Sequence, residues 1–125
     1  MIISIHSDNA PHAVGPYSQA IKVNGFIFCS GQIGINPDSG NLVEGLENQT
    51  RQIFKNLQEI LSSSGANMQN VIKTTVFLTN MKDYSKMNSI YAEFFGNHKP
   101  ARSTIEIAKL PKDALIEIEL IALGT

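Results

Sequence analysis

The last quarter of the chain, Pro100 to Leu123, constrains the fold most, because two strongly β-patterned runs follow one another there. The runs Arg102–Ile107 and Leu115–Leu123 are joined by a turn-like link at Leu110–Asp113. Side chains alternate between the two faces of a strand. One face of the second run is apolar throughout, whereas the other mixes acids with large hydrophobic residues. We therefore expect a sheet covered on both faces here, with some of its charges partly desolvated.

Hydrophobic periodicity and turn residues predict the other elements. Strands are expected at Ile2–His6, Ala20–Val23, Phe26–Ile33 and Val71–Leu78. The dipeptide Asn24-Gly25 is a strong hairpin signal between the second and third of them. Helices are expected from Leu46 to a stop at Gly65, and from Asn80–Asp83 to Gly96. The order β-β-β-α-β-α-β-β predicts an α+β fold, with a mixed sheet and two helices on one face.

Several of these strands are apolar on both faces. In the hairpin, Phe26 and Phe28 share one face, and Ile27 and Cys29 share the other, which Ile33 is expected to continue. Two helices cover only one face of such a sheet, and no further segment remains to cover the second. A large apolar surface marks an interaction site. We therefore expect a homo-oligomer built on the sheet face.

Composition bounds the class of protein. A chain of 125 residues with 42% hydrophobic residues is expected to form one domain, residues 1–125. The formal charge of −1, without a basic stripe, argues against a nucleic-acid partner. The pattern shows no signal peptide and no membrane span. The single cysteine, Cys29, excludes an internal disulfide, fits a reducing compartment and is expected in the core. A soluble, cytoplasmic protein is the interpretation.

Neither a metal nor a cofactor is expected. His6, His12 and His98 are scattered in the sequence without a ligand pattern, and there is no cysteine cluster. Gly31 and Gly34 are isolated and do not open a helix, so a glycine-rich phosphate loop is absent.

Charged residues near the C-terminus are the main candidates for chemistry. Arg102 begins a strand directly after Pro100-Ala101, and a guanidinium held on a covered face binds a carboxylate through two parallel hydrogen bonds. Its alternative role is a structural salt bridge with Glu106, Glu117 or Glu119. Glu117 and Glu119 lie on one face, which suits either acid–base work or two acids that answer basic neighbours.

Three residues nearer the N-terminus are also candidates. Tyr17, beside Gly15-Pro16, is placed to donate a hydrogen bond into a pocket, or to act as an interface aromatic. Ser30-Gly31 interrupts a bulky strand, and glycine there marks the close approach of a ligand or another chain. Ser30 as a nucleophile is disfavoured, because no histidine is placed as its base.

Four segments, in this order, carry a resemblance that spans nearly the whole chain. They are Gly15–Ala20 (GPYSQA), Ser30–Ile33 (SGQI), Lys73–Leu78 (KTTVFL) and the C-terminal stretch Pro100–Glu119 (PARSTIEIAKLPKDALIEIE). The chain thereby resembles the RidA/YjgF family of reactive-intermediate (imine and enamine) deaminases. The resemblance implies a chorismate-mutase-like fold and a homotrimer with sites between subunits. It implies hydrolysis of 2-imino acids to 2-oxo acids and ammonia.

The resemblance also assigns roles to residues. Arg102 would grip the substrate carboxylate, and Glu117 would hold or polarise a water. Ser30 and Gly31 would line the pocket, with Tyr17 and Asn88 contacting it. Thr104 stands where many relatives carry cysteine; we expect backbone groups of that strand to serve, because imine hydrolysis needs no nucleophile beyond water.

Two other classes stay open. The same carboxylate pocket would serve a regulatory module that binds 2-oxo acids or amino acids without important turnover. Some relatives are described as translation inhibitors with ribonuclease activity, and the slightly acidic balance argues against that function.

Overall fold

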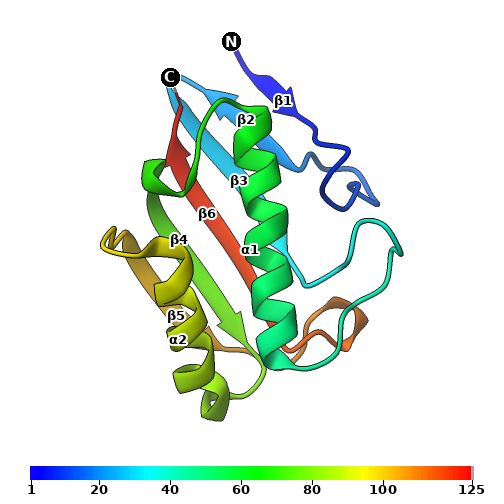
Figure 1. Ribbon diagram of the computed structural model, residues 1–125. Helices are drawn as coiled ribbons and strands as arrows, with labels where there is room; N and C mark the ends of the chain where they lie inside the picture. Colours follow the sequence, from blue (N-terminus) through cyan, green and yellow to red (C-terminus); the bar gives the residue numbers. More distant parts are fainter. Residues whose placement is uncertain (125) are drawn as a thin grey trace.

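Six strands form one sheet, and two helices lie on one of its faces (Figure 1). The computed structural model describes residues 1–124. The elements in chain order are β1 (Ile3–Ile5), β2 (Ala20–Val23), β3 (Phe26–Gln32), α1 (Leu46–Ser63), β4 (Val71–Leu78), α2 (Tyr84–Phe95), β5 (Ala101–Glu106) and β6 (Ile116–Leu123). Short 3-10 turns precede β4, α2 and β6. The predicted order β-β-β-α-β-α-β-β and the α+β class are confirmed.

The strand order across the sheet is β1-β2-β3-β6-β4-β5. All neighbours are antiparallel except β4 and β5, which run parallel because α2 carries the chain back between them. The tight turn of the β2–β3 hairpin places Asn24 at φ 50° and Gly25 at φ 79°. Both central residues of such a turn need positive φ, which is the reason for the Asn-Gly dipeptide. The C-terminal strand therefore lies in the middle of the sheet, between two halves made earlier in the chain.

The hydrophobic core lies between the sheet and helix α1. Ile53, Phe54 and Leu57 of this helix are fully buried, and they pack against the inner side chains of β3, β4 and β6. Phe54 also stacks on Phe94 of α2, at 4.8 Å between ring centroids, so that it links the two helices. Truncating a side chain such as Leu57 to alanine would cost about 2–5 kcal/mol.

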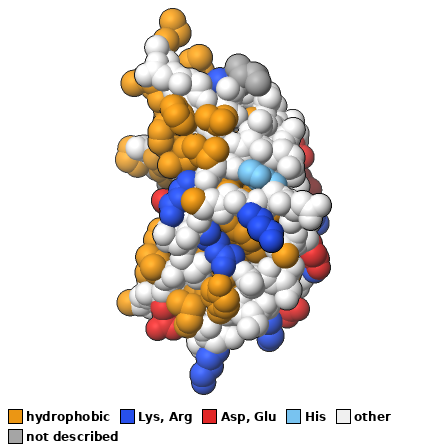
Figure 2. All heavy atoms as spheres, turned by 90° about the vertical axis from the view of Figure 1, so that its left-hand side faces the viewer, with side chains coloured by type: hydrophobic (Ala, Val, Ile, Leu, Met, Phe, Trp, Pro, Cys, Tyr) orange, Lys and Arg blue, Asp and Glu red, His pale blue; other side chains and the backbone are white. Residues whose placement is uncertain are grey.

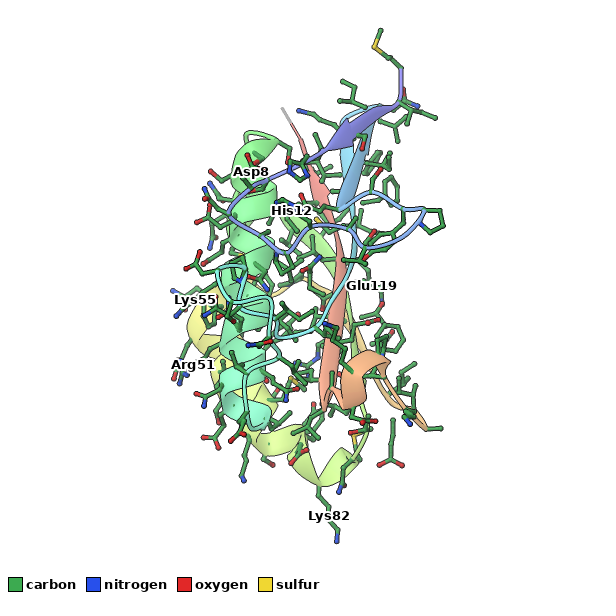
Figure 3. All side chains as sticks on the ribbon, turned by 90° about the vertical axis from the view of Figure 1, so that its right-hand side faces the viewer. Asp8, His12, Arg51, Lys55, Lys82 and Glu119 are labelled. Atoms are coloured by element: carbon green, nitrogen blue, oxygen red, sulfur yellow. The ribbon has the colours of Figure 1, made fainter. Side chains whose placement is uncertain are left out.

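The opposite face of the sheet is left open by the described chain, as expected. Phe26 and Phe28 are 40% and 44% exposed there, and Leu123 and Ile105 are 45% and 44% exposed. Figure 2 shows hydrophobic side chains gathered along one flank of the molecule, and Figure 3 shows Glu119 pointing away from the side that carries α1. We call this surface the open face. Its exposed aromatic and aliphatic side chains mark it as an interaction surface.

One expectation about β3 was wrong. Ile33 was predicted to continue the buried side of Ile27 and Cys29, but a β-bulge shifts the register between Cys29 and Gln32. Gln32 therefore takes the inward position, where it is buried, and β3 ends there. Because the period of a strand is two residues, one extra residue turns every later side chain to the other face.

Neither helix within residues 1–124 combines the length and hydropathy that crossing a bilayer requires.

Candidate functional site

Arg102 is held between the edge strand β5 and helix α2. Its Nη1 donates a hydrogen bond to Oδ1 of Asn88, and its Nη2 donates one to the hydroxyl of Tyr84, both at 2.8 Å. The guanidinium carbon lies 4.7 Å from the ring centroid of Tyr91, which is a cation–π distance. The three α2 residues share a helix face because they are spaced at i, i+4 and i+7. We use the name arginine group for Arg102, these three helix residues and Thr104.

No acidic side chain of residues 1–124 pairs with this cation. Among residues 1–124, Arg102 forms no ion pair, and Glu106 instead accepts a hydrogen bond from the backbone N–H of Met81 at 2.7 Å. The structural salt bridge that the sequence left open is therefore not formed in this chain. A guanidinium has five N–H donors, and its two hydrogen bonds here leave the others available. The arginine group is thus a fixed cation that can still receive a carboxylate.

Thr104 follows Arg102 on the same side of β5. Its Oγ1 is buried and has no hydrogen-bond partner in the described part of the chain. An unpaired buried hydroxyl costs about 1–3 kcal/mol, so a group that reaches it from outside would gain that energy. In addition, β5 is an edge strand, so backbone N–H and C=O groups along its outer side have no neighbouring strand.

A second set of candidates surrounds a cavity of about 620 Å³. Tyr17, Gly31 and Glu117 line it, and we call these three the cavity group. The rest of the wall includes His12, Lys112 and residues of the loop between β3 and α1, namely Ile35, Pro37 and Gly40. This loop therefore shapes the pocket mouth.

Glu117 and Gly31 fit each other closely. A Cβ on Gly31 would lie 2.5 Å from Oε2 of Glu117, which is shorter than any real contact. The glycine is therefore required by the carboxylate that packs on it. Burial raises the pKa of Glu117 above its usual value, and the nearby charge of Glu119 raises it further. A carboxyl group with a raised pKa is suited to accept and return a proton near neutral pH.

Ser30 lies beside this group but does not line the cavity. Its hydroxyl donates to the carbonyl oxygen of Ser18 at 2.6 Å, and its backbone N–H donates to the carbonyl of Gln19 at 2.9 Å. Ser30 thus ties β3 to the segment that follows Tyr17. Tyr17 itself is 54% exposed in the single chain.

The two groups lie on opposite faces of the sheet. Arg102 is in register with Thr74, and Thr74 is in register with Leu120; both partners are buried under the helices. Glu117 is in register with Phe77 and lies on the other face. Two strand spacings and three residues separate their backbones, a distance of about 14 Å. A small substrate cannot touch both groups in one chain.

Sequence reasoning missed some of these contacts. Tyr84 and Tyr91 bracket Asn88 at helical spacing, and that pattern was a usable signal. Lys112 lines the cavity from a tight turn at φ 56°, which no local motif indicates. The histidines are not all scattered either: His6 and His12 come together beside Asp8, because the loop after β1 folds back on itself.

A six-stranded sheet with two helices on one face is the fold of the YjgF/RidA family. The chain belongs to this family: the family model described as endoribonuclease L-PSP matches residues 7–124. A RutC family protein of Pyrococcus horikoshii is 52% identical, over 94% of each chain. The human 2-iminobutanoate/2-iminopropanoate deaminase is 45% identical, over 95% of this chain and 88% of its own.

Solved structures agree. A Rid family protein from Yersinia pestis, of unknown function, is 50% identical and superposes with a TM-score of 0.97 over the whole of both chains. The Escherichia coli protein TdcF, crystallised with bound serine, is 36% identical with a TM-score of 0.94, over 98% of this chain and 99% of its own.

Proposed function

We propose that the protein hydrolyses reactive 2-imino acids, such as 2-iminobutanoate and 2-iminopropanoate, and their enamine tautomers, to 2-oxo acids and ammonia. One observation carries the proposal: a fixed cation that forms no ion pair with any described residue and a carboxyl group with a raised pKa lie on opposite faces of one chain. The cation would bind the carboxylate of a small substrate, and the carboxyl group would transfer protons during the reaction.

In this proposal a second copy of the chain completes the site. The open face exposes Phe26, Phe28 and Leu123, and burying them against another copy would be worth about 25 cal/mol per Å² of apolar area. A cyclic homotrimer would place the arginine group of one subunit against the cavity group of the next. The expected mass in solution is three times that of the 13.7 kDa chain.

The proposed reaction needs only a few groups from the protein. Arg102 would bind the carboxylate through two parallel hydrogen bonds, and the edge of β5 near Thr104 would hold the rest of the substrate. Glu117 would take a proton from a water that attacks the C2 carbon of the protonated imine, giving a neutral tetrahedral carbinolamine. Returning that proton to the nitrogen makes ammonia the leaving group. The C–N bond then breaks as the carbinolamine hydroxyl gives its own proton to Glu117 and becomes the carbonyl of the 2-oxo acid. Positioning and electrostatic stabilisation suffice for this reaction.

The test combines two single variants. Arg102→Ala and Glu117→Gln should each abolish turnover of 2-iminobutanoate generated by a coupled enzyme. In mixed oligomers formed from equal amounts of the two variants, about a quarter of the sites would join an intact arginine group to an intact cavity group. Activity should therefore return to about that fraction of wild type.

Three results would contradict the proposal. Full turnover by Arg102→Ala in a folded oligomer would remove the carboxylate anchor. Mixed oligomers, verified by mass, that stay inactive would exclude a site shared between subunits. A wild type without activity on any 2-imino acid would exclude the reaction.

A second candidate is a non-catalytic protein that binds 2-oxo or amino acids. The serine bound to TdcF supports it, because a free amino acid carries the same carboxylate that Arg102 would grip. Calorimetry with 2-oxobutanoate and serine, run beside the deaminase assay, separates the two functions. Tight binding together with absent turnover would favour this second function.

Ribonuclease action is the weakest candidate. The family model carries an endoribonuclease description, but the chain has a net charge of −1 and ten basic residues, in no obvious cluster. RNA cleavage that survives stringent purification and is lost in Arg102→Ala or Glu117→Gln would favour ribonuclease action over the other two candidate functions.

A further inference from the structure

We propose that His6, Asp8 and His12 form a surface site for a borderline transition-metal ion of the Zn²⁺ class. The ligand atoms of the three side chains all lie within 4.8 Å of one another. They are the only group of at least three His, Cys, Asp or Glu ligands with this spacing in residues 1–124. The proposal does not require the deaminase function, although His12 also lines the wall of the cavity that contains Glu117.

The three side chains converge on one point. Oδ1 of Asp8 lies 2.8 Å from Nε2 of His6 and 3.5 Å from Nε2 of His12. The two imidazole rings meet edge to face, with centroids 4.9 Å apart. In a tetrahedral site with bonds of about 2.0–2.1 Å, ligand atoms are about 3.4 Å apart. Small side-chain rotations therefore bring both nitrogens and one oxygen to that spacing.

The backbone of this loop is already fixed. Gln19, which is 2% exposed, accepts a hydrogen bond at its Oε1 from the N–H of Ser7 and donates from Nε2 to the carbonyls of Ser7 and Pro11. Ser7 lies between His6 and Asp8, and Pro11 precedes His12. One buried amide thus holds both ends of the ligand segment, and such support lowers the cost of assembling a metal site.

The donor set selects the kind of ion. Two imidazoles and one carboxylate suit Zn²⁺, Cu²⁺ or Ni²⁺, whereas Mg²⁺ and Ca²⁺ take oxygen ligands. The side chains are 56%, 85% and 65% exposed, so an ion can enter and water can fill the remaining positions. Cys29 does not compete, because burial raises the pKa of its thiol to about 12 and metal binding needs the thiolate.

Calorimetry with ZnCl₂ on the untagged 125-residue chain tests the site. We expect one ion per chain, and at least a tenfold loss of affinity in each of His6→Ala, Asp8→Asn and His12→Ala. Asp38→Asn, which removes an exposed carboxylate from another loop, should bind as wild type does. MgCl₂ should give no binding heat.

A second measurement reports the ligands directly. Cu²⁺ bound to wild type should show an electron paramagnetic resonance spectrum with hyperfine coupling to two imidazole nitrogens, and His12→Ala should leave one. Zinc binding that is unchanged in Asp8→Asn and His12→Ala would overturn the proposal. So would the absence of zinc binding to wild type, or a Cu²⁺ spectrum without nitrogen coupling.

Discussion

The arginine group and the cavity group are built by different means. Arg102 is oriented by hydrogen bonds and ring contacts from one helix, α2, which packs directly on its strand. Glu117 is oriented by the absence of a side chain at Gly31 and by loops that close around it. The first group is rigid in a single chain, whereas the second depends on a close backbone approach. The proposed function requires both groups. A variant that disrupts one group alone therefore tests its contribution separately.

The largest effect should come from separating the groups without touching either. Phe28→Asp places a charge on the open face, where the wild-type ring is 44% exposed. We expect monomers, folded by circular dichroism, with deaminase activity reduced by at least about 10³-fold, because positioning by both groups is lost. Lys55→Asp, on the helix side of the molecule (Figure 3), introduces the same aspartate and also removes a positive charge, and it should keep both assembly and activity.

Should Phe28→Asp fail to fold, Ile105→Asp carries the same prediction at the other end of the open face. A folded, active monomer of either variant would contradict a shared site.

The second-largest effect is expected from Gly31→Ala, which disturbs the cavity group. The added methyl would lie 2.5 Å from Oε2 of Glu117, so the carboxylate must move. We expect kcat to fall by about 10²-fold, in the range for removing a positioned base. In a Glu117→Ala background, where no turnover remains to compare, the same change should cost little thermal stability, because no carboxylate remains to displace. Equal losses of Tm in both backgrounds would show that Gly31 acts elsewhere.

A smaller loss is expected within the arginine group. Asn88→Ala and Tyr84→Phe each remove one hydrogen bond of 2.8 Å from the guanidinium, worth about 1–2 kcal/mol, or roughly tenfold in kcat/KM. Because Arg102 would bind the carboxylate, the change should appear mainly in KM. A fall confined to kcat would contradict the anchoring role.

The smallest effect concerns stability. The pKa of Glu117 is raised in the folded chain, chiefly by burial, so its ionisation opposes folding as pH rises through the folded value. Glu117→Gln should therefore raise Tm slightly at neutral pH, by about 1–3 °C, while abolishing activity. The gain should vanish below the ordinary glutamate pKa, where both states are protonated. A gain that persists at acid pH, in scanning calorimetry, would point to packing instead.

Much of the fold was predictable because its signals are local. The Asn24-Gly25 turn and the apolar spacing of both helices predicted their elements within a few residues. The alternation in β5 also placed Arg102 and Thr104 together. Which face the helices cover could not be deduced, because it depends on pairing between strands far apart in the sequence. The faces of the sheet on which Arg102 and Glu117 lie were likewise open in the sequence, and their placement on opposite faces emerged only from the register.

Two features have no local signal. The bulge between Cys29 and Gln32 adds one residue opposite β6, and it brings Gly31 against Glu117. The cluster of His6, Asp8 and His12 depends on Gln19, whose amide reaches back to Ser7 and Pro11. Both arise from contacts between segments that the sequence separates.

Strand β5 ends the sheet with no neighbour on its outer side. Unpaired strand edges can pair with other chains, and exposed aromatic surface strengthens the resulting aggregates. A variant that weakens assembly should therefore lose solubility before it loses its fold. In a cell such a defect would be seen first as inclusion bodies and proteolysis.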